Sequence, residues 1–421
     1  MIKNILKLNS ILLIALFAAV VSCSKDDGGN SGGAPYISYV RVTDPVSKDS
    51  LLVAASQGQL IAIVGGNLQN TKQLWFNDQR ASLDPTYISN TAIIATVPTL
   101  VPMDVNNKMK LIFANGDSLM YDFKVTISKP IIDGANGSKP NGMDSEYVLD
   151  GDSAVIHGNY LYLPMTVTFT GGVSVSSEDG DITANAQDLN VPYSIIKVKV
   201  PEGAQPGPIY ITNNFGAAMS DFWFRDNRNI FRGFDNDGDF NLGSVGTIVS
   251  DPGAGDPPCI NGKYLRHVST GQTWWNQLTV NWSTPLTGIP DEAILHPEMY
   301  YFKFECCTTK PFNGGGLKIW ITSMSQANGG PYYDWGSEQL DPNQKPAVGL
   351  GPYFDSKGAW HTVTIPFENI AIAEGTTFPS IQPNGYFFGA VWADGTALDC
   401  DMSFDNFRVV PKDLFGSSYG N

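Results

Sequence analysis

The chain has 421 residues, which is too long for one ordinary domain and indicates two to four. It carries 26 Lys and Arg residues against 41 Asp and Glu residues, a formal net charge of −15, and this acidity argues against nucleic acid as a partner. Its 43 Gly, 27 Pro and 11% aromatic residues, with only 16% charged residues, are typical of turn-rich β-structure.

Residues 1–22 have the pattern of an export signal. Lys3 and Lys7 form a basic start, residues 11–21 are apolar but too few to span a bilayer, and a small-residue site ends at Cys23. This pattern resembles a bacterial lipoprotein signal. The resemblance implies that residues 1–22 are removed and that Cys23 is lipidated. A soluble secreted protein with an incidental cysteine is the alternative.

Residues 23–34 are rich in Gly, Ser and Asp and lack apolar periodicity, so they predict a flexible lipidated stalk. The Ser-Lys-Asp-Asp at 24–27 resembles the acidic export signal of Bacteroidetes lipoproteins. That resemblance implies a protein anchored by lipid in the outer membrane and facing the cell exterior.

Two stretches, residues 35–128 and 129–225, carry the same order of short strands and Gly, Pro and Asn turns. Each has a Gly-rich hairpin, at 58–68 and 151–161, then a strand ending in Val-Pro and a late turn ending in Gly. The repeat predicts two tandem β-sandwiches. The pattern resembles the IPT/TIG immunoglobulin-like family, in which such domains are usually spacers or interaction modules. Trp75 and Trp223 lie in apolar strand patterns and are expected in the cores.

Residues 226–421 differ in composition from the two repeats and hold seven of the nine tryptophans. Short strands alternate with long polar loops, and helical periodicity is confined to a turn near 291–295. This pattern predicts a larger, jelly-roll-like β-sandwich. The fold class expected for the whole chain is therefore all-β, with two immunoglobulin-like sandwiches followed by a larger one.

Strand alternation in this third region turns several aromatic side chains outward. Three strand patterns are each expected to present one aromatic residue beside polar side chains, namely Trp275, Tyr301 and Trp320. The residues expected inward on the strand of Trp320 are Leu317, Ile319 and Ile321, and the polar residues expected beside Tyr301 are Lys303 and Glu305. Trp360, which alternates with two threonines, is also expected to point outward.

The segment 329–336 adds Tyr333 and Trp335 in a stretch too rich in Gly and Pro to bury them. Flat aromatic rings stack on the C–H faces of sugars, while amides and charged groups bind hydroxyls. The glycan-binding residues predicted from these patterns are Trp275, Trp320, Tyr333 and Trp335.

The lipoprotein start, the tandem immunoglobulin-like repeats and the Trp-rich last region together resemble the surface glycan-binding proteins of Bacteroidetes polysaccharide-utilisation systems, in particular those with a C-terminal xyloglucan-binding domain. The resemblance implies a non-catalytic protein that captures a β-glucan such as xyloglucan or mixed-linkage β-glucan. It also implies that the protein acts together with a SusD-like protein, a TonB-dependent transporter and a surface glycanase.

Two other functions stay open. A surface glycoside hydrolase needs two carboxylates about 5–10 Å apart, and Glu305, Asp334 and Glu338 are candidates, although nothing in their spacing selects them. No nucleophile, metalloprotease or phosphate-loop motif occurs, so no catalytic residue is assigned. An adhesin that binds a protein partner is the second alternative.

The acidic run at 235–239 suggests a structural calcium ion shared by Asp235, Asp237 and Asp405, whereas a solvated turn is the simpler interpretation and no metal ligand is assigned. Four cysteines besides Cys23 are expected to be structural, with one or two disulfides possible and their pairing open. They are Cys259, Cys306, Cys307 and Cys400.

Overall fold

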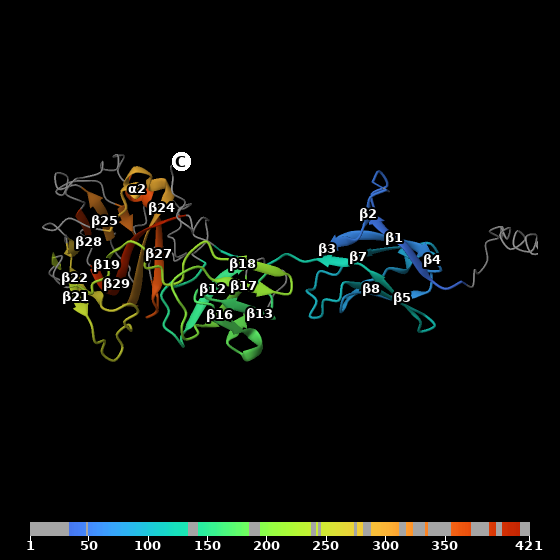
Figure 1. Ribbon diagram of the computed structural model, residues 1–421, viewed down its shortest axis with the longest axis horizontal. Helices are drawn as coiled ribbons and strands as arrows, with labels where there is room; N and C mark the ends of the chain where they lie inside the picture. The colour runs from blue at the N-terminus through green and yellow to red at the C-terminus, as the bar shows by residue number, and fades with distance from the viewer. Residues whose placement is uncertain are drawn as a thin grey trace, which may run out of the picture. The chain divides into compact units, whose positions relative to one another are not determined.

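The computed structural model describes residues 33–47, 49–133, 142–184, 194–236, 241–242, 246–272, 276–280, 288–310, 317–322, 333–335, 355–371, 387–392 and 398–412. The chain divides into two compact units, Met1–Thr126 and Ile127–Asn421. The regular secondary structure of the described residues is almost entirely β-sheet, which confirms the all-β fold class (Figure 1). Within these ranges, no helix is both long and apolar enough to cross a membrane.

The first unit is a β-sandwich. Its elements are β1 Tyr36–Val42, β2 Leu51–Leu52, β3 Ala54–Ser56, β4 Leu60–Gly66, β5 Thr71–Phe76, β6 Gln79–Ala81, the 3-10 helix η1 Pro85–Tyr87, β7 Ala92–Thr96, β8 Lys108–Phe113, β9 Ser118–Asp122 and β10 Lys124–Thr126. Two antiparallel sheets have the orders β2-β1-β4-β7 and β6-β5-β8-β9, and β10 pairs with β3 in parallel. Alternate residues of both sheets, such as Ile63 and Leu74, are fully buried and form the core.

The second unit begins with another pair of sheets. Its first elements are β11 Ile131–Ile132, β12 Ser153–Asn159, β13 Met165–Thr168, β14 Ser174–Ser176, η2 Ser177–Asp179, β15 Ile182–Ala184, β16 Ser194–Lys199, β17 Tyr210–Asn213 and β18 Gly216–Met219. The sheet orders are β11-β12-β16-β15 and β14-β13-β17-β18. They enclose a core in which Phe169 and Phe224 meet edge to face with ring centres 5.0 Å apart.

One glycine has the same role in both immunoglobulin-like repeats. A Cβ atom on Gly65 of β4 would lie 1.9 Å from the carbonyl oxygen of Tyr36, and one on Gly158 of β12 would lie 2.1 Å from that of Ile131. Each oxygen belongs to the antiparallel neighbouring strand. The missing side chain therefore lets the two backbones approach, which explains why the hairpin motif carries glycine in both copies.

We expect Gly65→Ala and Gly158→Ala each to lower the free energy of unfolding by about 1–3 kcal/mol, because a strand backbone must move to admit the methyl group. Urea unfolding of the soluble chain measures the change. Gly253→Ala is the matched control, since its Cβ would come no closer than 3.4 Å to the nearest atom, a carboxylate oxygen of Asp256. Equal stability of all three variants would contradict this explanation.

The rest of the second unit is a larger sandwich. Its elements are β19 Ile230–Arg232, β20 Asn241–Leu242, β21 Gly246–Val249, β22 Tyr264–Gln272, β23 Asn276–Val280, α2 Asp291–Leu295, η3 Pro297–Met299, β24 Tyr300–Lys310, β25 Leu317–Thr322, β26 Tyr333–Trp335, β27 His361–Pro366, α3 Phe367–Ala371, β28 Phe387–Trp392 and β29 Leu398–Pro411. The larger sheet has the order β21-β22-β29-β24-β27, with β19 also on β29, and the smaller sheet has the order β20-β23-β28-β25-β26.

The two sheets of this sandwich face each other across one aromatic core. Phe304 of β24 stacks on Phe407 of β29 with ring centres 5.0 Å apart and planes 23° apart. Ile319 and Ile321 of the smaller sheet belong to the same buried cluster. The predicted domain ranges 35–128, 129–225 and 226–421 stay predictions.

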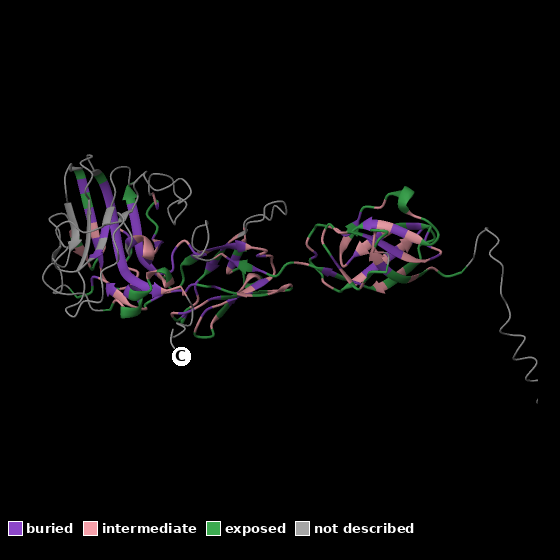
Figure 2. Ribbon diagram, turned by 90° about the horizontal axis from the view of Figure 1, so that it is seen from above, coloured by how far each residue is buried: buried purple, intermediate pink, exposed green. Residues whose placement is uncertain are grey.

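The two central strands of the larger sheet are buried on both faces (Figure 2). Every residue in 301–308 of β24 and 400–410 of β29 is buried, polar residues included. One face of the sheet covers the aromatic core. The other face is therefore covered as well. Charged side chains of that face belong to the buried cluster described below.

Candidate functional site

The smaller sheet brings three of the four predicted glycan-binding residues onto neighbouring strands. Trp320 lies on β25 opposite Gly389 of β28, and Tyr333 and Trp335 lie on β26, which pairs with the other edge of β25. The register pairs Tyr333 with Ile319 and Trp335 with Leu317, whereas Trp320 stands at an alternate position of β25, so it does not place the three residues on one face of the sheet. Trp275 lies outside the described residues, as does Cys23. The assignment of all five residues stays a prediction.

Alternation correctly predicted the inward side of β25 at two positions. Ile319 is fully buried and Ile321 is 3% exposed. Strand β26 pairs with β25 through Asp334 and Lys318 among others, and it forms the edge of the smaller sheet.

Strand β24 was expected to add an exposed aromatic residue to this surface, and that expectation is wrong. The strand belongs to the larger sheet, whereas β23 and β25 belong to the smaller one. Tyr301 is 5% exposed, and the ammonium group of Lys412 lies 5.0 Å from the centre of its ring. Lys303 and Glu305, expected to be exposed beside it, are also buried.

The outward orientation expected for Trp360 is wrong as well. Its side chain is buried, its indole N–H donates to the carbonyl oxygen of Pro258 at 2.9 Å, and its ring meets Tyr264 edge to face at 5.4 Å. The hydroxyl of Tyr264 in turn donates to the carbonyl oxygen of Pro257. The proline segment before β22 therefore covers this part of the larger sheet.

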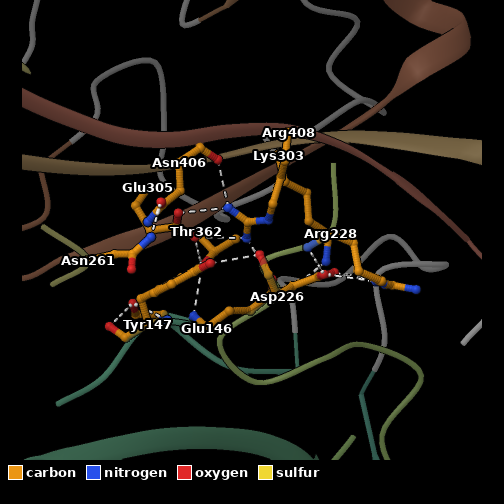
Figure 3. Close-up of polar contacts among 11 residues, drawn as sticks. Glu146, Tyr147, Asp226, Arg228, Asn261, Lys303, Glu305, Thr362, Asn406 and Arg408 are labelled. Atoms are coloured by element: carbon orange, nitrogen blue, oxygen red, sulfur yellow. Dashed lines mark hydrogen bonds and ion pairs between the residues drawn. The ribbon is translucent and has the colours of Figure 1, made fainter. Parts of the chain in front are cut away.

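Four charged side chains form a buried cluster on the covered face of the larger sheet (Figure 3). Glu146 comes from the segment that precedes β12, Lys303 and Glu305 from β24, and Arg408 from β29. None of the four is more than 2% exposed. Lys303 and Arg408 are direct register partners, so the two cations lie side by side on adjacent strands.

The two carboxylates compensate the two cations by close contacts. The ammonium group of Lys303 donates to Glu146 at 2.5 Å, and the guanidinium of Arg408 donates to the other oxygen of Glu146 at 2.8 Å. Arg408 also binds both oxygens of Glu305, at 2.7 and 2.9 Å. Burial raises the pKa of Glu305, and the neighbouring Arg408 acts against that rise. Such a cluster is stable only while every charge keeps its partner.

Three hydrogen bonds that involve the backbone reinforce this contact between the immunoglobulin-like part of the unit and the larger sandwich. The N–H of Glu146 donates to the hydroxyl of Thr362 at 2.7 Å, and the N–H of Thr362 donates to the carbonyl oxygen of Asp144 at 2.9 Å. The hydroxyl of Tyr147 donates to the carbonyl oxygen of Asp226 at 2.8 Å. The cluster therefore fastens the segment around Glu146 to the larger sheet, and its role is structural.

The buried position of Glu305 removes one candidate for glycoside hydrolysis. Its carboxylate is bound by Arg408 and by the hydroxyl of Thr362, so it has no open side for a sugar. Asp334 lies on β26 opposite Lys318, and Glu338 lies outside the described residues. Glu305 is therefore not available as one of the two carboxylates that this reaction needs.

The suggested calcium site lies only partly within the described residues. No group of three or more His, Cys, Asp or Glu side chains within them is arranged to hold a metal ion. Asp237 lies outside them, and one oxygen of Asp235 accepts the N–H of Lys263 at 2.8 Å. Asp405 is fully buried, one of its oxygens accepts the N–H of Asn406 at 2.8 Å, and the other has no hydrogen-bond partner in the part of the chain that the structure describes.

The cysteines of the last region are free thiols, so the structure contains neither of the disulfides considered from the sequence. Cys306, Cys307 and Cys400 are fully buried and Cys259 is partly so. Burial raises the pKa of Cys307 to about 11 and that of Cys400 to about 12. These thiols are therefore protonated and unreactive at neutral pH.

Comparison with known proteins found a family, a curated protein and solved structures to which this chain is similar. Residues 224–411 match the family described as surface glycan-binding protein B xyloglucan binding domain. An IPT/TIG domain-containing protein of Bacteroides ovatus is 27% identical over 222 residues, which are 50% of this chain and 43% of that protein. The chain therefore spans less than half the length of this curated relative.

Solved structures of two surface glycan-binding proteins align with this chain, and the first of them is similar in fold. Surface glycan-binding protein PbSGBP-B of Prevotella bryantii is 23% identical, with a TM-score of 0.61, over 90% of this chain and 99% of that one. SGBP-B from a complex xyloglucan utilization locus of Bacteroides uniformis is 20% identical, with a TM-score of 0.47, over 90% and 100%. The C-terminal sandwich of this chain is thus similar to the xyloglucan binding domain of surface glycan-binding protein B, and the chain is also similar to an IPT/TIG domain-containing protein.

Proposed function

We propose that this chain is a non-catalytic cell-surface protein that captures a β-glucan, with xyloglucan or mixed-linkage β-glucan as the preferred ligand. The match of residues 224–411 to a xyloglucan-binding domain family carries the proposal. The proposed ring-stacking residues include Trp320 on β25 and Tyr333 and Trp335 on β26.

Trp275 completes the proposed set of ring-stacking residues. Each stacked ring contributes on the order of 1 kcal/mol, so a site of this kind has micromolar to millimolar affinity. Many copies that engage one polymer then retain it far more strongly than a single site. Weak single sites also suit a protein that passes its ligand on.

The proposed setting follows from the sequence. Cys23 is the site of lipidation, residues 23–34 are the stalk, and the protein faces the exterior from the outer membrane. Its proposed partners are a SusD-like protein, a TonB-dependent transporter and a surface glycanase of the same system.

Affinity electrophoresis of the soluble chain 24–421 tests this proposal with gels that contain xyloglucan, mixed-linkage β-glucan, mannan, starch or no polysaccharide. We expect retardation in one or both β-glucan gels and about fivefold to tenfold weaker binding by Trp320→Ala, which corresponds to loss of about 1–1.4 kcal/mol. The control is Tyr210→Ala, which removes an exposed aromatic side chain, 41% accessible, from β17 in the immunoglobulin-like part.

Each remaining outcome identifies a different function. Free migration in every gel would overturn glycan capture and favour the adhesin alternative. Release of reducing sugar from a retarded polysaccharide would show a glycoside hydrolase. Retardation that Trp320→Ala leaves unchanged would retain the function but remove Trp320 from the site.

A further inference from the structure

The first unit presents an exposed sheet face with a different composition from the rest of this acidic chain. Across the sheet β6-β5-β8-β9, the register places Arg80, Trp75, Lys110 and Met120 directly opposite one another. Opposed residues of antiparallel strands point to the same face, with Cβ atoms about 4.5–5.5 Å apart. Arg80 and Met120 are exposed, and Trp75 and Lys110 are half-buried.

Alternation shows that this row lies on the outer face. Leu74 and Phe76 on either side of Trp75 are buried, as are Met109 and Leu111 on either side of Lys110. The expectation that Trp75 belongs to the core is therefore wrong. Its neighbours in the strand fill the core, and Trp75 itself covers the sheet from outside.

A hydrogen bond holds the indole of Trp75 in place. Its N–H donates to the side-chain carbonyl of Gln73 at 2.9 Å, two residues away on the same face of β5. Trp223, the other tryptophan expected in a core, is half-buried with the guanidinium of Arg228 4.1 Å from its ring centre. Among the described residues no cation is stacked on Trp75 in this way, and its half-buried ring is partly exposed on the outer face of the sheet.

The two cations that flank Trp75 are also available. Neither Arg80 nor Lys110 forms an ion pair with any residue in the described part of the chain, whereas Lys108, two residues from Lys110, contacts Asp122. Arg80 and Lys110 sit on the strands either side of Trp75, about 10 Å apart by strand spacing. In a chain with a net charge of −15, a ring between two uncompensated cations selects for a ligand that is both flat and anionic.

We propose that this face, formed by Gln73, Trp75, Arg80 and Lys110, is a second glycan site that binds a carboxylate-bearing sugar, the uronic acid unit of an acidic polysaccharide. The pyranose ring stacks on the indole, the carboxylate accepts hydrogen bonds from Arg80 or Lys110, and the amide nitrogen of Gln73 donates to a hydroxyl. This site lies in the first unit and takes a charged ligand, so it is independent of the β-glucan site proposed above.

Binding of the soluble chain 24–421 to immobilised polygalacturonate at low ionic strength tests the site. The same polymer after reduction of its carboxyl groups and immobilised polyglutamate serve as comparison surfaces. We expect binding to polygalacturonate alone, weakened at least about tenfold by Trp75→Ala and about threefold to tenfold by Lys110→Gln. Lys108→Gln is the matched control, because that lysine is already paired with Asp122.

Thermal unfolding of each variant shows whether it is folded, and Trp75→Phe offers a more conservative change that keeps an aromatic ring. Absence of binding to polygalacturonate by the folded wild type would overturn the proposal. So would equal binding to polyglutamate, which would show charge attraction or a protein ligand, or equal loss in Lys110→Gln and Lys108→Gln. Because xyloglucan binding is not used as a readout, failure of the β-glucan proposal leaves this result unaffected.

Discussion

Replacing Arg408 with methionine is expected to lower the free energy of unfolding of the second unit by about 3–5 kcal/mol. Arg408 is fully buried and contacts both Glu305 and Glu146, so its removal leaves two carboxylates in a dry interior with only Lys303 to compensate them. Methionine retains most of the side-chain volume, so the loss reflects charge more than packing. Urea unfolding followed by circular dichroism measures it.

The same two strands offer a matched control. Lys310 of β24 contacts Asp399 of β29 at 3.0 Å, but both side chains are more than half exposed. Lys310→Met should change stability by no more than about 0.5 kcal/mol, because exposed ion pairs contribute little. A loss below about 1 kcal/mol in Arg408→Met, similar to the control, would show that water reaches the cluster and that its charges do not need one another.

A second substitution distinguishes the effect of the unpaired charges on stability from the effect of lost packing. Adding Glu146→Gln to Arg408→Met removes one of the two uncompensated carboxylates, so the double variant should be less destabilised than the sum of the single variants. Because Glu146 belongs to the immunoglobulin-like part and Arg408 to the larger sandwich, such coupling would also show that the two parts are energetically linked.

The fold could be predicted from the sequence because its signals are local. The repeated hairpin predicted two related sandwiches, and the structure gives its glycine a physical reason in Gly65 and Gly158, where a neighbouring carbonyl oxygen leaves no room for a side chain. The same strand alternation correctly placed Ile319 and Ile321 inward. Such patterns depend on the nearest strands alone.

The site was harder to predict because burial by a distant segment leaves no local trace. Alternation assigned Lys303 and Glu305 to one face of β24, and that assignment agrees with their shared contacts to the cluster. It could not show that Glu146, 157 positions before Lys303, covers that face. The one available signal was charge of both signs at alternate positions of an otherwise apolar strand. Trp360 was misplaced for the same reason, since Pro258 lies 102 positions away.

The stability of Asp405→Asn is expected to rise relative to the wild type as the pH is raised. Asp405 is fully buried, and burial together with the neighbouring carboxylates of Glu305 and Asp235 holds its pKa well above the usual value. The folded state therefore keeps a proton that the unfolded state releases above its ordinary pKa of about 3.9. The contribution of this group is present at low pH and is lost as the pH rises toward the folded pKa, by about 1.4 kcal/mol per pH unit.

Asparagine has the same shape and cannot ionise, so the variant lacks this loss. Urea unfolding of both proteins at pH 4.5, 6 and 7.5 should therefore give a difference that grows with pH in favour of Asp405→Asn. A difference in stability between the two proteins that stays the same at all three pH values would show that Asp405 is ionised in the folded protein. A cation bound by Asp405 would reverse the order, because the variant would then be the less stable protein at pH 7.5 and a chelator would lower the melting temperature of the wild type alone. The same measurement thus decides between a buried neutral acid and the calcium site suggested by the acidic run at 235–239.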